Sequence, residues 1–213
     1  MDCGLCPRIT AYRAENAARH PDWHNAPVSS FGDPRASLLI VGLAPGRKGA
    51  NRTGRVFTGD QAGVLLYAKL AEAGWASGRI EDRPDDGLDL DGVMITNALA
   101  CAPPLNRPLA SEIANCRRFL AARIAALPRL RAILSLGRIS HDAVLRALDR
   151  TPRRFPFAHG ARHDLGPFTL FDSYHCSRYN VHTGRLTPAM LADVLMQIRT
   201  HLARCLPTRP GNA

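Results

Sequence analysis

The sequence predicts an α/β fold, a three-layer α/β/α sandwich around a central, mainly parallel, four-stranded sheet. Four short runs rich in branched and aromatic apolar residues have the length of buried strands. Longer stretches between them carry apolar residues at three- and four-residue spacing, as amphipathic helices do. Because strands and helices alternate, the strands are expected to run parallel with helices on both faces of the sheet.

The elements follow one another in a regular order. The strand candidates span residues 37–42, 92–97, 131–136 and 168–173. The helix candidates span residues 62–74, 111–126, 139–148 and 187–205. The last helix is expected to begin with Thr187 as its N-cap and Pro188 as its first helical residue, a common start signal.

In such a sheet, ligands bind beyond the carboxyl ends of the strands. The first strand leads into the Gly-rich residues 42–46, the second ends at Asn97, and the fourth leads into residues 174–177. These ends carry polar or Gly-rich chemistry and are therefore the expected site. The segment 78–91 has six acidic residues in fourteen and is predicted to be a solvated surface loop without a site.

Composition indicates one globular domain with a basic surface. The 213 residues are 46% hydrophobic, enough for a single core, so one domain is expected over residues 1–206 with a flexible tail at 207–213. The net charge is +10, and Lys48 and Lys69 are the only lysines among 28 basic residues. Arginine presents a planar fork that matches phosphates and base edges, so nucleic acid is one expected partner. Coding bias toward arginine is the open alternative.

Several protein classes are excluded. No apolar run reaches the roughly 18 to 20 residues that span a bilayer. The N-terminus has neither the basic nor the apolar region of a secretory signal, so a cytoplasmic protein is expected. We expect a monomer that is associated with the nucleoid through DNA.

The sequence contains six cysteines. In the reducing cytoplasm that is expected for this protein, they indicate metal binding or reactive thiols more than disulfides. Cys3 and Cys6 form a C-x2-C pair, and Cys101 and Cys116 follow about a hundred residues later. Four thiolates suit Zn²⁺ or a 4Fe-4S cluster, and the loose second spacing slightly favours the cluster. Scattered buried thiols are the alternative. Cys205, on an apolar helix face, is expected in the core.

The segment 42–60 follows a strand and precedes a helix, as nucleotide-binding loops do. It lacks both the G-x-G-x-x-G order and the G-K-[ST] ending of a P-loop, so a nucleotide-processing α/β enzyme is a weak alternative. It offers backbone N–H groups, cationic side chains, the amide of Asn51 and the ring of Phe57. A flat base stacked on Phe57 would suit this set, although Phe57 is equally well explained as a core residue.

The fourth strand leads into His175, which is expected at the same sheet edge as Asn97 and the Gly-rich loop. A histidine there can donate a hydrogen bond to developing negative charge. Arg178 and Tyr179 follow closely as a cation and an aromatic ring. The other histidines lack comparable neighbours in the sequence.

Together these motifs resemble the 4Fe-4S uracil-DNA glycosylases, most closely the subgroup called family five. The group's first motif, G-L-A-P-G-x-x-G-A-N-R-T-G-R-x-F-T-G-D, matches residues 42–60 almost letter for letter. Its second block resembles residues 96–104 with 115–117, and its third resembles residues 175–187. The third motif usually reads His-Pro-Ser, so Cys176 in place of proline is a departure that puts the conformation of this loop in doubt.

The resemblance implies a DNA repair glycosylase that flips out uracil, or other deaminated bases, and hydrolyses the N-glycosidic bond without cutting the strand. It implies that Phe57 stacks on the base, Asn97 reads its amide edge, and His175 lies near the uracil O2. The Gly42–Leu43–Ala44 backbone would help to hold the departing anion. The resemblance also implies a 4Fe-4S cluster with a structural role, held by Cys3, Cys6, Cys101 and Cys116.

Two roles are less directly indicated. No carboxylate stands at Leu43 or Ala44, where relatives outside the subgroup carry one, so Asn51 is our first candidate for orienting the attacking water and Asp60 the second. Arg178 and Tyr179 are candidates for a wedge that fills the space left by the flipped base. Six cations are expected to border the DNA site: Arg47, Lys48, Arg52, Arg55, Arg178 and Arg185.

The main alternative is a non-catalytic protein of similar construction that recognises damaged bases in DNA without cleaving them. The missing early carboxylate and the altered His-Cys-Ser sequence favour it. Excision of uracil from an oligonucleotide discriminates between the two.

Overall fold

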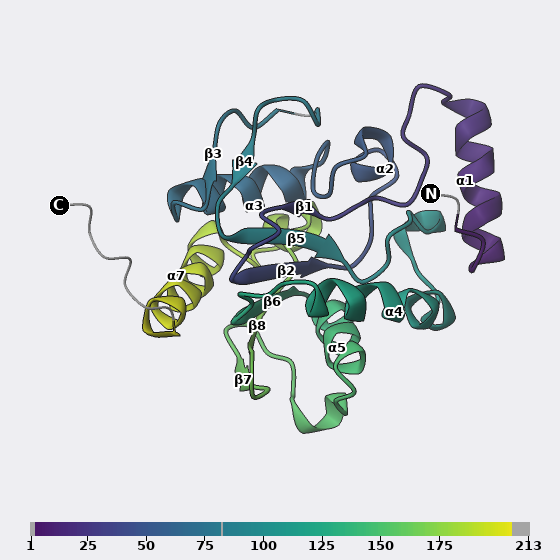
Figure 1. Ribbon diagram of the computed structural model, residues 1–213. Helices are drawn as coiled ribbons and strands as arrows, with labels where there is room; N and C mark the ends of the chain where they lie inside the picture. The colour runs from purple at the N-terminus through teal and green to yellow at the C-terminus, as the bar shows by residue number, and fades with distance from the viewer. Residues whose placement is uncertain (1–2, 82, 206–213) are drawn as a thin grey trace.

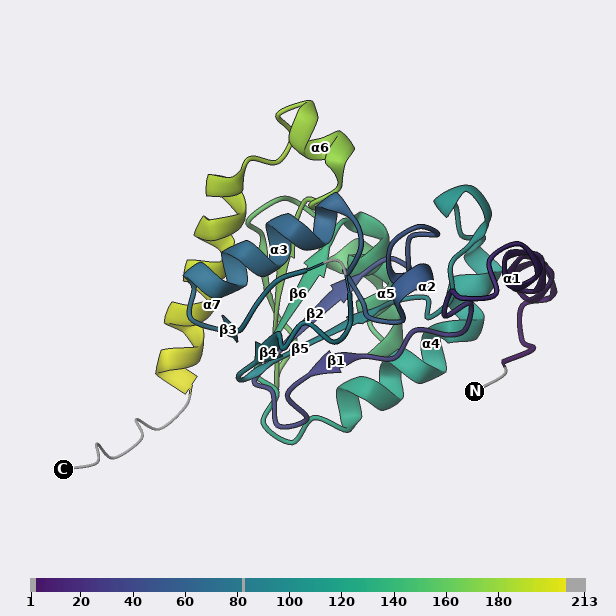
Figure 2. The ribbon, with the colours of Figure 1, turned by 90° about the horizontal axis from the view of Figure 1, so that it is seen from above.

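The computed structural model describes residues 3–81 and 83–205 and has a six-stranded sheet at its centre (Figures 1 and 2). The strand order is β1-β5-β2-β6-β8-β7. The four central strands are parallel and lie within one residue of the predicted bounds. They are β5 (Val93–Asn97), β2 (Leu38–Gly42), β6 (Ala132–Leu136) and β8 (Thr169–Ser173). The predicted fold class is confirmed.

The predicted number of four strands was too low. Two short antiparallel strands, β1 (Phe31–Gly32) and β7 (Arg162–Asp164), complete the sheet at its edges. A separate hairpin pairs β3 (Ala76–Ser77) with β4 (Asp89–Leu90). Strands of two or three residues are too short to show an alternating pattern, so the sequence does not reveal them.

Helices cover both faces of the sheet. One core cluster joins α3 (Gln61–Glu72) and α7 (Pro188–Cys205) to one face, where Leu38 and Ile40 of β2 are fully buried. A second cluster joins α4 (Ala110–Ala125) and α5 (Arg138–Ala147) to the opposite face. All four helices lie within about two residues of their predicted bounds. The Thr187 hydroxyl accepts from the Met190 amide at 3.2 Å, which confirms the predicted N-cap of α7.

Three further α-helices lie outside the sandwich. They are α1 (Pro7–Arg19), α2 (Ala50–Thr53) and α6 (Arg178–His182). Helix α1 is not predicted from the sequence because it is polar overall, and only Ile9 and Asn16 of it are buried. Two short 3₁₀ turns, η1 (Pro104–Asn106) and η2 (Pro152–Arg154), precede α4 and follow α5.

The two cysteines outside the predicted ligand set differ in burial. Cys205, expected in the core, is exposed, whereas Cys176 is fully buried. The tail at 207–213 lies outside the described residues, and the single domain over residues 1–206 stays a prediction. Within residues 3–81 and 83–205, no helix is long and apolar enough to cross a membrane.

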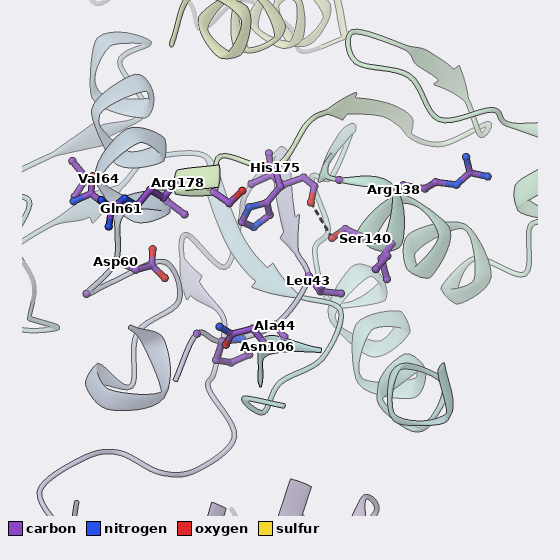
Figure 3. A pocket seen from close by; sticks show the side chains of 18 residues that line it. Leu43, Ala44, Asp60, Gln61, Val64, Asn106, Arg138, Ser140, His175 and Arg178 are labelled. Carbon is purple, nitrogen blue, oxygen red and sulfur yellow. Dashed lines mark hydrogen bonds between the residues drawn. The ribbon is translucent and has the colours of Figure 1, made fainter. Parts of the chain in front are cut away.

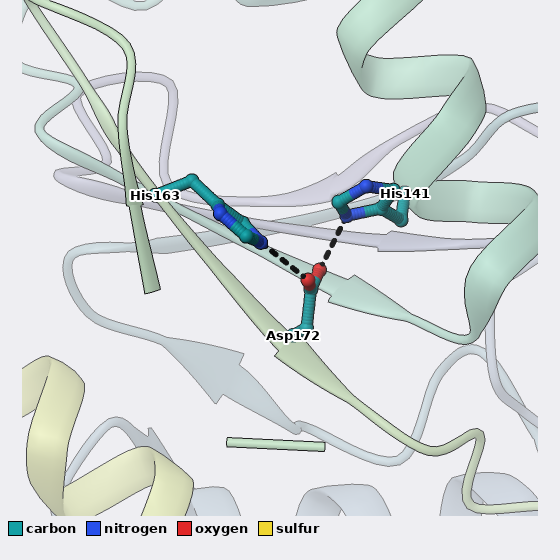
Figure 4. A group of neighbouring side chains, drawn as sticks. All are labelled: His141, His163 and Asp172. Atoms are coloured by element: carbon teal, nitrogen blue, oxygen red, sulfur yellow. Dashed lines mark hydrogen bonds and ion pairs between the residues drawn. The ribbon is translucent and has the colours of Figure 1, made fainter. Parts of the chain in front are cut away.

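A buried polar cluster ties α5 to the sheet (Figure 4). His141 places Nδ1 2.8 Å from Asp172 Oδ1 and Nε2 2.8 Å from the Phe155 carbonyl oxygen. Because both ring nitrogens face acceptors, the contacts favour the doubly protonated, cationic ring. Burial opposes this charge, but the hydrogen bond and charge of Asp172 outweigh it and raise the pKa of His141. His163 and Ser135 also donate to Asp172, at 3.1 and 2.6 Å, so the carboxylate is well satisfied.

A second buried ion pair corrects the prediction for residues 78–91. Asp86 is 6% exposed and forms a bidentate pair with Arg55 at 2.7 and 2.6 Å. The same carboxylate accepts from the amides of Glu81 and Leu88. The Arg55 hydrogen bond, partly opposed by burial, holds the pKa of Asp86 well below its usual range. This segment is therefore anchored to the Gly-rich loop and is not simply a solvated loop.

The Asp86 pair generates a prediction about stability. Asp86→Ala should lower the free energy of unfolding by about 3–5 kcal/mol, because it leaves the Arg55 guanidinium buried without its partner. Since the pKa of Asp86 is depressed, its contribution is present above the ordinary carboxyl pKa and disappears as the pH falls through the folded value. Urea unfolding between neutral and acid pH should therefore show a steeper acid loss for the wild type than for the variant.

Asp85→Ala is the matched control, because the Asp85 side chain is 76% exposed and lies 3.8 Å from Arg83. Its effect should stay within about 0.5 kcal/mol. Equal destabilisation by the two variants would contradict a buried, specific Arg55 pair.

Candidate active site

The carboxyl ends of the parallel strands open into a cavity of about 750 Å³ (Figure 3). The residues after β2 form one wall, and the start of α5 forms another. His175, which follows β8, and Asp60, at the start of α3, also line the cavity. The site therefore lies at the edge of the sheet where the sequence places it.

A smaller cavity of about 30 Å³ continues inward from the large one. The two cavities share the lining of Ala44, Asp60 and His175. Phe57 and Asn97 line only the inner one. The large cavity is the wider entrance to the inner one. The inner cavity is lined by an aromatic ring, an amide, an imidazole and a carboxylate, from Phe57, Asn97, His175 and Asp60.

The inner cavity depends on the absence of a side chain at Gly42. This residue pairs with Asn97 in the register of β2 and β5. A Cβ on Gly42 would lie 2.4 Å from Asn97 Oδ1 and 2.7 Å from the Phe57 ring. Any larger residue would displace both side chains, so glycine at this position is a requirement of the site.

Phe57 is held in a backbone conformation that phenylalanine rarely adopts, with φ of 51°. Its ring lies 6.0 Å from the His175 ring, and the two planes differ by 27°. A Cβ on Gly63 would lie 1.7 Å from the Phe57 carbonyl oxygen, so α3 packs directly beneath this residue. Strain of this kind persists only where the surroundings enforce it, and it is concentrated at functional sites.

Asp60 and His175 line the same two cavities, but their side chains differ in contacts and in charge. One carboxylate oxygen of Asp60 accepts from the Gly63 amide at 3.0 Å and caps α3. The other lies against the Gly-rich loop, 2.7 Å from where a Cβ on Gly49 would stand. Burial lowers the pKa of His175, and the charge of Asp60 partly opposes this. His175 is therefore neutral near pH 7 and offers one N–H and one lone pair.

The segment after His175 is fixed by its own side chains. The Asn180 amide donates to the His175 carbonyl at 2.8 Å, and the Ser177 hydroxyl caps α6. Cys176 lies in the apolar core, where burial raises its pKa to about 12. This cysteine therefore fills a core position, and Asn180 is a positioning residue whose role the motif alone does not disclose.

Four cysteines gather beside the site, between α1 and α4. Cys3, Cys6, Cys101 and Cys116 line one small apolar cavity. Three N–H groups face their sulfurs: the Asn115 amide toward Cys6 at 3.5 Å, the Ala100 amide toward Cys116 at 3.5 Å, and Arg13 toward Cys101 at 3.9 Å. Donors aimed at sulfur suit thiolates that bind a metal centre.

Comparison with known proteins identifies the family. Residues 29–199 match the uracil DNA glycosylase superfamily. The chain belongs to this superfamily. A type-5 uracil-DNA glycosylase of Thermus thermophilus is 45% identical over 204 residues, which cover 92% of each chain. The corresponding protein of Pyrobaculum aerophilum is 40% identical and covers 92% of this chain and 87% of its own. A type-4 enzyme of Archaeoglobus fulgidus is 33% identical over 57% of this chain and 54% of its own.

Within this glycosylase fold, the predicted site residues divide into two groups. The lining of the cavities includes Leu43, Ala44, Phe57, Asp60, Asn97, His175 and Arg178. Asn51 is 3% exposed, lines neither cavity, and donates from Nδ2 to Asn25 Oδ1 at 3.0 Å. Tyr179 is 72% exposed on α6. Arg185 lies over the Tyr174 ring at 4.7 Å.

The prediction that six cations border the DNA site is wrong for one of them, Arg55. Arg55 is 5% exposed and paired with Asp86. Arg47 donates to Asn16 at 2.7 Å and lies 5.2 Å from the centre of the Trp23 ring, so it fastens the Gly-rich loop to α1. Arg55 therefore serves the internal structure of the fold, and a DNA contact by the partly exposed Arg47 stays a prediction. Sequence position alone could not separate Arg55 from solvent-facing cations.

The electrostatics of His175 generate a prediction. Asp60→Asn should lower the pKa of His175 further, because it removes the charge that opposes desolvation. A pH titration of labelled histidine by NMR measures this shift. Asp193→Asn is the matched control, because Asp193 acts on His159 and should leave the His175 titration in place. A rise in the pKa of His175 on Asp60→Asn would contradict the assignment.

Proposed function

We propose that this protein is a monofunctional uracil-DNA glycosylase that binds uracil flipped out of DNA and hydrolyses its N-glycosidic bond, leaving an abasic site. The observation that carries the proposal is the place where the outer cavity of about 750 Å³ meets the inner one, which Phe57, Asn97 and His175 line. Membership of the superfamily and the relatives named as type-5 uracil-DNA glycosylases support it.

Recognition of the base follows from the chemistry of the inner cavity. The Phe57 ring offers a flat apolar surface for stacking. The Asn97 amide has a donor and an acceptor side by side, which complements the alternating N–H and C=O groups on the edge of uracil. The Ala44 amide has no backbone partner within the described residues and lines the same space, so it can donate to a uracil oxygen. Leu43 lines the outer cavity, and Gly42 leaves room for the Asn97 and Phe57 side chains.

Cleavage of the bond leaves positive charge on the sugar and negative charge on uracil, and the site must stabilise both. A neutral His175 donates its N–H to the oxygen on which the negative charge develops, without the desolvation cost of an imidazolium. The sugar cation resembles the oxocarbenium ion of glycoside hydrolysis. The adjacent DNA phosphates and the Asp60 carboxylate provide negative charge near it.

Asp60 is the better candidate for orienting the attacking water, which reverses the order expected from the sequence. It is an ionisable carboxylate on the wall of both cavities, and one of its oxygens is fixed by the cap of α3. Asn51 instead holds the loop through Asn25, which in turn donates to the His20 carbonyl. We assign Asn51 a positioning role.

The four cysteines fit a 4Fe-4S cluster better than a single zinc ion. Cys101 and Cys116 have fourteen residues between them in the sequence, a looser spacing than the close pairs of structural zinc sites, and N–H donors face the sulfurs. When bound, such a cluster supplies a cross-link between α1 and α4. Burial raises the pKa of the Cys101 thiol to about 11, so binding exchanges protons for metal at buried sulfur. We assign the ligand set Cys3, Cys6, Cys101 and Cys116.

The partner is DNA that contains uracil or related deaminated bases. Arg178 lines the outer cavity, and Lys48, Arg138 and Arg178 are exposed for contact with phosphates. A chromosomal substrate places the protein in the cytoplasm, in association with the nucleoid, where it acts as a monomer.

The function is tested by excision of uracil from an oligonucleotide, read as strand cleavage after alkali. His175→Ala should lower kcat about a hundredfold or more, because one donor to the leaving anion is lost. Asp60→Asn should lower kcat more than Asn51→Ala does, whereas the exposed control Asp193→Asn should have no effect. Binding of uracil-containing DNA without excision would show the non-catalytic alternative. A larger loss in Asn51→Ala would restore the order expected from the sequence.

The metal assignment is tested on the purified protein. Wild type should contain about four irons per chain and show the broad visible absorbance of an iron–sulfur protein. Cys116→Ser should lose both, together with thermal stability, whereas the exposed control Cys205→Ser should retain them. One zinc per chain with no visible absorbance would overturn the assignment.

A further inference from the structure

Leu105 is the most exposed of the large apolar side chains in the described part of the chain, at 84%. Its φ is 56°, and that of Asn106 is 55°. Two consecutive residues other than glycine in the left-handed region cost free energy, and leucine gains nothing locally from that conformation. The fold therefore displays an apolar side chain to water from a strained turn.

This turn is rigid. Pro103, Pro104 and Pro108 restrict the backbone on both sides of it. The Asn106 amide donates to the Pro103 carbonyl, and the Arg107 amide donates to the Pro104 carbonyl, each at 3.1 Å. The turn is thus closed by its own backbone, and Leu105 lies at its tip.

The turn is also fastened to its surroundings. The Arg107 carbonyl accepts from Arg8 of α1 at 3.0 Å. Arg8 makes a bidentate contact with Glu112 at 2.8 Å, and Glu112 accepts from the Leu109 amide at 2.7 Å. A side chain held in this way loses little conformational freedom on binding, which is the property of a pre-organised contact.

The position of the turn relates Leu105 to the proposed active site. Asn106 lines the outer cavity, on the side opposite Arg178 of α6 (Figure 3). Seen from above, the teal segment before α4 and the yellow-green α6 both rise beyond the carboxyl ends of the strands (Figure 2). Arg138 and Arg178 at the same cavity provide positive charge for a phosphate backbone. Leu105 is therefore the immediate neighbour of a residue of the cavity wall.

We propose that Leu105 is an apolar wedge that enters the base stack of double-stranded DNA when the target base occupies the cavity. The proposal rests on the proposed function and adds a second point of insertion to the one expected at Arg178 and Tyr179. A flipped base leaves an apolar gap between its neighbours, and a rigid leucine can fill this gap without an unsatisfied polar group. Single-stranded DNA has no continuous stack to enter, so the contact matters only for duplex substrate.

The test separates the side chain from the backbone of the turn. Leu105→Asn keeps a residue that tolerates positive φ and removes the apolar wedge, whereas Leu105→Met keeps an apolar side chain. Leu105→Asn should lower kcat/KM on duplex uracil DNA about tenfold and leave the single-stranded value within about twofold. Leu105→Met should restore most of the duplex activity. Leu109→Ala is the matched control, because Leu109 is a 50% exposed leucine at the N-cap of α4, outside the turn that displays Leu105.

A measurement of DNA binding separates insertion of Leu105 into the base stack from cleavage of the glycosidic bond. Duplex DNA with 2-aminopurine beside the uracil should brighten when wild-type protein binds, because the probe is unstacked, and should brighten less with Leu105→Asn. Equal losses on single and double strands, or equal brightening by the two proteins, would overturn the wedge. Brightening that depends on Leu105 in a protein that excises no uracil would support the wedge and refute the proposed function.

Discussion

The contact between Gly42, Asn97 and Phe57 is the constraint on which the rest of the site depends. Strands β2 and β5 bring Gly42 beside Asn97 in register, and the missing side chain lets the Phe57 ring approach both. Phe57 can take this place only with a positive φ, and Gly63 makes room for its carbonyl. The loop between β2 and α3 is therefore shaped from both ends, and Asp60 and His175 face the space that remains.

Much of the central fold follows from the sequence because its elements are buried on both sides. The parallel strands are continuous apolar runs, and the four main helices have clear apolar stripes, so both are visible without a structure. The edge strands and α1 are missed for a physical reason. The edge strands are too short to show a period, and α1 is polar overall, so contacts with other elements stabilise them.

The site shows the same division. Strand ends and motif positions bring Phe57, Asn97 and His175 to one edge, and the structure places them around one cavity. The sequence does not show which polar side chains are buried and already hydrogen-bonded within the fold. Asn51 and Arg55 stand in the same motif as Phe57 and Asp60, yet both are buried with partners from distant segments. The Asp172 cluster likewise depends on His141 and His163, which no motif relates to each other.

The segment from Cys101 to Cys116 carries a consequence for how this protein can vary. Within sixteen residues it contains two assigned cluster ligands, the turn that displays Leu105, and the first turns of α4. Its two ends, Cys101 and Cys116, line the cysteine cavity, and the Arg8–Glu112 pair holds its middle. An insertion that changed the reach of the turn would also shift a proposed ligand. Among relatives, the distance to which this turn extends toward DNA should therefore change by substitution of the residue at position 105. It should seldom change by a different length of the segment.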